Sequence, residues 1–98
     1  MIAVPLDRVE RLEACDDYVA ICNEGHQHLL HASLQDLHAR LDPSRFIRVH
    51  RSHVINRAFV SAIEPRDGSR LTIVLSSGAR VPASRAGSAQ MRVMKLVS

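Results

Sequence analysis

The segment Arg70–Leu75 constrains the fold most, because its apolar and polar residues alternate between two runs of turn-forming residues. This alternation predicts a β-strand with one buried face. The runs on either side, Asp67–Ser69 and Ser76–Gly78, are rich in residues that favour tight turns. Residues 79–83 are therefore expected to return beside the strand. Pro82 makes this return an edge strand or a strand about to end, since proline has no N–H group for a ladder hydrogen bond.

Further short strands are predicted in the first half of the chain. Residues 18–22 form a strand-like run that leads into the turn signal Asn23–Gly25, and residues 26–31 follow as the returning strand of a hairpin. Another strand is expected where the apolar residues Ile47 and Val49 occupy alternate positions. The chain is thus predicted to be mainly β.

Two helices are also predicted. Ser33 is expected to cap the first helix, whose apolar stripe of leucines lies within residues 34–41 and which Asp42–Pro43 should end. The second helix is predicted at residues 87–97. It places Met91, Met94 and Val97 on one side, with Val93 and Leu96 beside them. The expected order of elements is strand, strand, helix, strands and helix.

The chain has 98 residues, of which 46% are hydrophobic, and this suits one globular domain that spans residues 1–98. No apolar run approaches the roughly 18 residues that a membrane span needs. The first residues lack the basic and apolar regions of a signal peptide. The expected location of the chain is therefore the cytoplasm.

Charge is divided unevenly along the chain. Residues 1–42 hold three basic and eight acidic residues, a net charge of −5, whereas residues 43–98 hold ten basic and two acidic residues, a net charge of +8. This polarity indicates one face that meets a polyanion. A solvated surface with chance clustering is the alternative.

The basic half begins with a dense group of arginines between Arg45 and Arg57. Arg51 shares strand parity with the apolar residues before it, so either the strand ends first or the side chain projects from the rim of the sheet. From there a guanidinium can donate two hydrogen bonds to guanine O6 and N7. Arg48 and Ser52 are better placed for phosphate oxygens. Surface ion pairing is the alternative, although this half offers few carboxylates.

Other polar positions add to this interpretation. Arg85 is a second arginine in a short connection after a strand, and Ser84 beside it can cap the last helix or contact a phosphate. The loop with Asp17 and Tyr18 is a possible third contact to bases, although carboxylates that face phosphates are unfavourable. Asn56 follows a buried-looking pair and is more typical of a cap than of a base-reading residue.

Metal binding and catalysis find little support. His26 and His28 share a strand face, but a third ligand would have to come from elsewhere and no metal signature is present. Ser52, His50 and Asp67 can be drawn as a triad, yet nothing fixes their geometry, and neither a nucleophile elbow nor a glycine-rich phosphate loop occurs. We predict no enzyme activity, no cofactor and no metal.

Two segments resemble the signatures of one family, the LytTR DNA-binding domain. Phe46–Asn56 matches its run of Phe, Arg, an apolar residue, His-Arg-Ser, apolar positions and Asn. Val81–Arg85 matches its second run of apolar, Pro, apolar, Ser and Arg. The resemblance covers essentially the whole chain. It implies an elongated α+β fold of small antiparallel sheets with two short helices. It also implies sequence-specific binding of DNA through loops that enter successive major grooves.

Carried over by position, the resemblance implies that Arg51 and Arg85 contact bases, with the Asp17–Tyr18 loop as a third region and Asn56 in a structural position. Together with the basic run itself, it gives as expected contacts to the DNA backbone Arg48, His50, Ser52, Arg57 and Ser84. The chain departs from the family at His53, where an aromatic or apolar residue is common. It departs again where Ala86–Gly87 replaces a bulkier start of the last helix.

The resemblance also implies partners. These are double-stranded promoter DNA, a sensor or phosphoryl-accepting receiver domain in the full-length protein, and a second copy if the chain binds direct repeats as a dimer. The rival hypothesis is a protein-interaction or ligand-sensing β-module whose basic face meets an acidic partner. RNA binding is disfavoured, because three aromatic residues leave few rings for base stacking.

Overall fold

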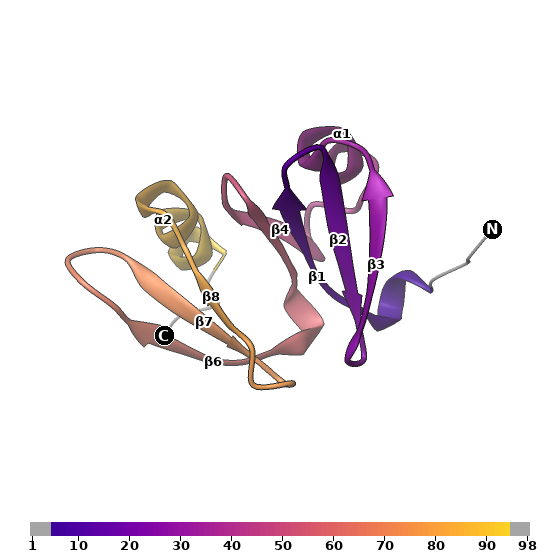
Figure 1. Cartoon of the computed structure of the whole chain (residues 1–98). Coiled ribbons are helices and arrows are strands. Elements are labelled where there is room, and N and C mark those ends of the chain that lie inside the picture. Colours follow the sequence, from indigo (N-terminus) through magenta and orange to yellow (C-terminus); the bar gives the residue numbers. More distant parts are fainter. Residues whose placement is uncertain (1–4, 95–98) are drawn as a thin grey trace.

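The computed structural model describes residues 5–94 and shows two antiparallel sheets and two short α-helices (Figure 1). The elements in chain order are η1 Leu6–Arg8, β1 Val9–Cys15, β2 Tyr18–Asn23, β3 His26–His31, α1 Leu34–Ala39, β4 Phe46–His50, β5 His53–Asn56, η2 Arg57–Phe59, β6 Val60–Pro65, β7 Leu71–Leu75, β8 Arg80–Pro82 and α2 Arg85–Val93. The molecule measures 41 × 23 × 21 Å, so the expected elongated, mainly β fold is confirmed. No helix in the described part is long and apolar enough to cross a membrane.

The first sheet has five strands in the order β3-β2-β1-β5-β4, and the second has three in the order β6-β7-β8. Every strand pair is antiparallel. Strand β8 lies at an edge, as Pro82 predicts. The predicted hairpin of β2 and β3 is present, and its turn carries Glu24 and Gly25 at positive φ.

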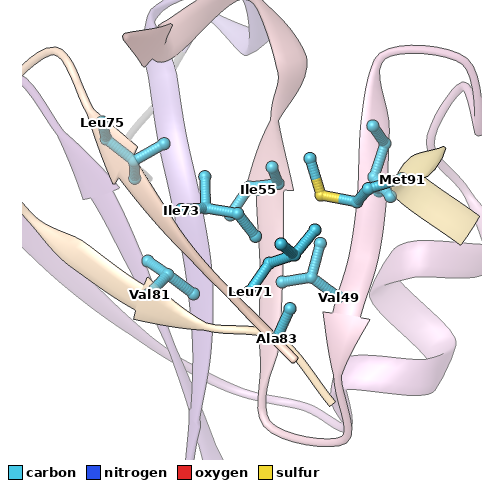
Figure 2. Packing of buried hydrophobic residues seen from close by; sticks show 9 residues of the cluster. Val49, Ile55, Leu71, Ile73, Leu75, Val81, Ala83 and Met91 are labelled. Atoms are coloured by element: carbon cyan, nitrogen blue, oxygen red, sulfur yellow. The ribbon is translucent and has the colours of Figure 1, made fainter. Parts of the chain in front are cut away.

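Strands β4 and β5 are buried on both faces, which places them at the centre of the molecule. Ile47, Val49 and Ile55 face the second sheet and α2, where they pack with residues such as Ile73 and Met91 (Figure 2). On the other face, a second cluster under α1 contains Val9, Leu12, Val19, Leu34, Phe46 and Val54. The five-stranded sheet therefore packs against one hydrophobic cluster on each face. Its β4–β5 hairpin is closely packed on both sides.

Three strands were not predicted, and two predictions about α2 need correction. Charged residues interrupt the apolar pattern of β1, β5 has only four residues and directly follows the basic turn, and β6 is an edge strand without a buried residue. Helix α2 begins at Arg85 rather than at residue 87, because Ser84 caps it by accepting from Gly87 N–H at 3.0 Å. Val93, expected beside the apolar side of this helix, is 80% exposed, whereas Met91 on that side is buried. The predicted helical residues 95–97 lie outside the described part.

Candidate nucleic-acid interface

Two tight turns lie side by side at one end of the five-stranded sheet. The β1–β2 turn contains Asp16 and Asp17, and the β4–β5 turn contains Arg51 and Ser52. Strands β1 and β5 are paired neighbours, and the N–H of Ala14 donates to the carbonyl oxygen of Ser52 at 2.9 Å. Because neighbouring strands lie about 4.8 Å apart, the two turns form one continuous rim.

The Arg51–Ser52 turn exposes Arg51 to solvent. Hydrogen bonds with two side chains hold the backbone of the turn in place. Strand β4 ends at His50, so the exposed Arg51 does not enter the core. Arg48 donates from Nη2 to the Arg51 carbonyl oxygen at 2.8 Å. The N–H of Ser52 donates to His50 Nδ1 at 3.1 Å. In a neutral His50 ring this bond leaves the hydrogen on Nε2, which is then free to donate to a ligand.

The second expected arginine reaches the same region from the other end of the chain. The N–H of Ser84 donates to the Val49 carbonyl oxygen at 2.8 Å, and the Ser84 hydroxyl also donates to that oxygen at 3.3 Å. This attaches the start of α2 to strand β4, one residue before the strand ends. Arg85, the first residue of α2, is exposed next to this junction. Arg51 and Arg85 thus lie in neighbouring loops.

A shallow hollow of ≈ 400 Å³ lies beside Arg85, lined by His50, Arg66, Arg70, Pro82, Ser84 and Arg85. Arg66 and Arg70 were not among the residues predicted for DNA contact. They flank the Asp67–Ser69 turn at the end of the second sheet, and Arg66 Nη2 donates to the Ala83 carbonyl oxygen at 2.6 Å. Their position on either side of a turn signal is a sequence feature that would have drawn attention to them.

The third expected contact region is present as an acidic turn with an exposed tyrosine. Asp16 has a positive φ of 54°, and both aspartates are exposed. Tyr18 is 46% exposed, and its ring lies edge-on to His31 with centroids 5.3 Å apart. This turn lies in the same rim as Arg51. Its carboxylates suit a base amino group better than a phosphate.

Arg57 is not brought together with the other expected contacts. It follows Asn56, which pairs with Phe46, whereas the turn lies beyond the pairing of His50 with His53. Its N–H donates to the Arg45 carbonyl oxygen at 2.8 Å. Arg57 consequently lies at the opposite end of the β4–β5 hairpin from Arg51.

Asn56 has a structural environment. Its side chain is fully buried, donates from Nδ2 to the Val9 carbonyl oxygen at 2.8 Å and accepts from Ala58 N–H at 3.0 Å. The second bond makes Asn56 the N-cap of η2. The residue thus connects β5, β1 and the segment that leads to the second sheet.

His53 lies under the turn in a half-buried group of ionisable side chains. Its ring centroid is 5.2 Å from that of His50, and its Nδ1 is 3.9 Å from Glu13 Oε1. Burial lowers the pKa of His53, and the Glu13 carboxylate opposes this only in part, while His50 and Arg11 lower it further. The neutral form of His53 is therefore favoured in the folded chain.

Comparison with known proteins gives a consistent family. The family model described as the LytTr DNA-binding domain matches residues 1–95. The solved LytTr DNA-binding domain of a putative methyl-accepting/DNA response regulator from Bacillus cereus superimposes with a TM-score of 0.89 at 32% identity, over 96% of this chain and 86% of that one.

Curated full-length relatives match the chain over part of their own length. The heme-containing CO-sensing transcriptional regulator RcoM 2 of Paraburkholderia xenovorans is 31% identical over 94% of this chain and 35% of the relative. The sensory transduction protein LytT of Bacillus subtilis is 31% identical over 71% of this chain and 29% of the relative. The chain thus spans about a third of the length of these relatives.

Proposed function

The chain belongs to the LytTr DNA-binding domain family, and from this premise we propose that it reads promoter DNA with Arg51 and Arg85. The observation that carries the proposal is the junction of Ser84 with Val49, which brings two exposed arginines from distant parts of the chain into neighbouring loops. Within residues 5–94, no ion pair joins either guanidinium to a carboxylate. Both are thus available to a ligand.

Arginine chemistry explains why these two positions are assigned to bases. A guanidinium presents a planar fork of donors that matches O6 and N7 of guanine in the major groove. An arginine at a turn or at the first position of a helix extends away from its sheet, so its tip can pass between the phosphates. Arg51 is moreover held at a defined position, because Arg48 donates to its carbonyl oxygen.

Neighbouring groups are suited to the DNA backbone. Ser52 and Ser84 lie beside the two arginines, and His50 keeps Nε2 free when its Nδ1 accepts from Ser52. Arg48 uses one nitrogen for the turn and retains other donors for a phosphate oxygen. Contacts of this kind fix the register of a protein on the duplex without reading its sequence.

The β1–β2 turn is the third region of the proposed interface. Asp17 can accept from the amino group of a cytosine, and the exposed Tyr18 hydroxyl can donate or accept. Because a carboxylate near a phosphate is repelled, we propose that this turn contributes to base choice rather than to overall affinity.

The regulatory context of the chain follows from the same family. Relatives such as the Bacillus subtilis LytT are described as sensory transduction proteins, and they are about three times as long as the matched segment. We propose that this domain is the output part of a transcriptional regulator that takes its signal from a sensor or receiver domain. We further propose that two copies bind direct repeats.

Competition binding tests the proposal. A duplex would be selected from a random library by the wild-type chain, and its binding measured against a scrambled duplex of the same composition. We expect wild type to prefer the selected duplex by a factor of 10³ or more, and Arg51→Gln to lose most of this preference. Equal binding of both duplexes by the wild type would instead favour the rival hypothesis of an acidic protein partner.

A further inference from the structure

The second sheet contributes two arginines to a surface that is otherwise formed by the first sheet and α2. Arg66 and Arg70 line the ≈ 400 Å³ hollow together with His50, Ser84 and Arg85. These residues come from three separate segments of the chain: the end of β4, the connection from β6 to β7, and the start of α2. The hollow is therefore a product of the tertiary fold rather than of one basic run.

The charge of the hollow has one sign. Three guanidiniums and an imidazole line it, and no carboxylate does. The nearest acidic partner, Asp67, has its Oδ1 4.0 Å from Arg70 Nε, and both side chains are largely exposed to solvent. An exposed pair at this distance contributes little and leaves the Arg70 guanidinium available to another anion.

One of the two arginines is fixed in place. Arg66 donates from Nη2 to the Ala83 carbonyl oxygen at 2.6 Å, which holds it against the connection between β8 and α2. A guanidinium has five N–H donors, so Arg66 retains donors for a ligand. Its position beside Ser84 and Arg85 gives the hollow a preorganised wall.

We propose that this hollow binds one phosphate of the DNA backbone, next to the base that Arg85 contacts. The inference rests on the proposed function and adds to it a contact from the second sheet. Arginine forks bind a phosphate bidentately, as they do a carboxylate. Arg85 itself lines the hollow. A duplex whose bases meet Arg85 therefore brings its backbone to Arg66 and Arg70. An acidic segment of another protein has no such link to the base-reading loops.

The experiment compares Arg70→Gln, Arg70→Lys and the control Arg57→Gln on the selected and scrambled duplexes, by fluorescence anisotropy across a salt series. Arg57 is an exposed arginine at the opposite end of the β4–β5 hairpin. We expect Arg70→Gln to weaken binding to both duplexes by the same factor. Its plot of log affinity against log salt should become shallower by about 0.9, the slope that one phosphate contact contributes. Arg70→Lys should keep the wild-type slope.

The other outcomes distinguish a failure of this inference from a failure of the proposed function. An unchanged slope and affinity for Arg70→Gln would mean that the hollow does not meet DNA, and an acidic protein segment would become the better ligand. Loss confined to the selected duplex would make Arg70 a base contact. If the wild type binds both duplexes equally, the proposed base reading fails, yet the slope measured on the scrambled duplex still decides whether Arg70 holds a phosphate.

Discussion

Gly87 and Val49 approach so closely that a β-carbon built on Gly87 would lie 2.0 Å from the Val49 carbonyl oxygen. Real β-carbons essentially never come this near to another heavy atom. Val49 belongs to the strand that leads to Arg51, and Gly87 lies in the first turn of the helix that begins with Arg85. The distance between the two proposed base-reading loops is thus set by a direct backbone contact. This contact gives a reason for the small residues at the start of α2.

Gly87→Ala is expected to destabilise the chain although alanine favours helices. The gain in helix propensity is about 1 kcal/mol, whereas the clash is with backbone, which cannot rotate away, and overpacking costs about 1–3 kcal/mol or more. We expect the clash to win and the Tm in thermal unfolding to fall by about 4–8 °C for each net kcal/mol. Ala89→Ser, an exposed change on the same helix, should alter stability by less than about 0.5 kcal/mol. A wild-type Tm for Gly87→Ala would contradict the close approach.

Asn56→Ala should be among the most damaging polar substitutions. It removes the N-cap of η2 and leaves the Val9 carbonyl oxygen without its side-chain donor. A lost cap costs about 1 kcal/mol, and an unsatisfied buried group costs about 1–3 kcal/mol. We expect urea unfolding to show a loss of about 2–4 kcal/mol. Asn56→Asp keeps the acceptor for Ala58 N–H but loses the donor to Val9. If it lowers the free energy of unfolding as little as a surface variant does, this would argue against the hydrogen bond to the Val9 carbonyl oxygen.

Stability should depend on pH through His53. Burial lowers the pKa of this residue in the folded chain, so below about pH 6.5, the ordinary value of histidine, the unfolded chain binds a proton that the folded chain resists. The free energy of unfolding should therefore fall as the pH decreases from about 6.5 through the lowered pKa of folded His53, and stay level above that range. His53→Phe should flatten this part of the profile in urea unfolding measured from pH 5 to 8.

Asp42 provides an internal control for that profile. Hydrogen bonds from the Ser44 hydroxyl and N–H lower the pKa of Asp42, so its stabilisation is lost only as the pH falls below the ordinary range of aspartate, near 4. Asp42→Asn should therefore lower the free energy of unfolding by a constant amount between pH 5 and 8 and leave the slope that His53 produces unchanged. A profile of His53→Phe that matches wild type between pH 5 and 6.5 would show that His53 is not the responsible group.

Arg57→Gln is predicted to bind the selected duplex with wild-type affinity. Its sequence position beside the basic run suggests a backbone contact, but the strand β5 separates it from the Arg51 turn. Gel-shift titration at fixed salt measures the affinity directly. A loss of fivefold or more would mean that DNA also covers the end of the hairpin that holds Arg45 and Arg57.

Much of the fold could be predicted because the relevant signals are local. The strand at Leu71–Leu75 alternates between two turns, and Ser33 caps α1 by accepting from Asp36 N–H at 3.0 Å. Strand β1 was missed because Glu10 is buried and Arg11 and Glu13 are partly buried, which hides the apolar period. Its charged side chains form ion pairs within the strand, and their burial comes from the neighbouring strands β2 and β5, which the apolar pattern does not reveal.

The sequence suggested residues for the candidate interface but not how they are arranged. Each signature contributes one arginine, and the family resemblance, rather than periodicity, joined them. Their proximity arises from the hydrogen bond between Ser84 and Val49, which are 35 positions apart in the sequence. The same lack of long-range information explains why Arg57 was grouped with Arg51 and why Arg66 and Arg70 were not.

The most direct test of the central claim is methylation interference on the selected duplex. Dimethyl sulfate methylates guanine N7, the atom to which Arg51 and Arg85 are proposed to donate. We expect methylation to block binding of the wild type at two separate guanine positions. Arg51→Gln should become insensitive at one of them and Arg85→Gln at the other. Identical interference patterns for the wild type and both variants would contradict the assignment of these arginines to bases.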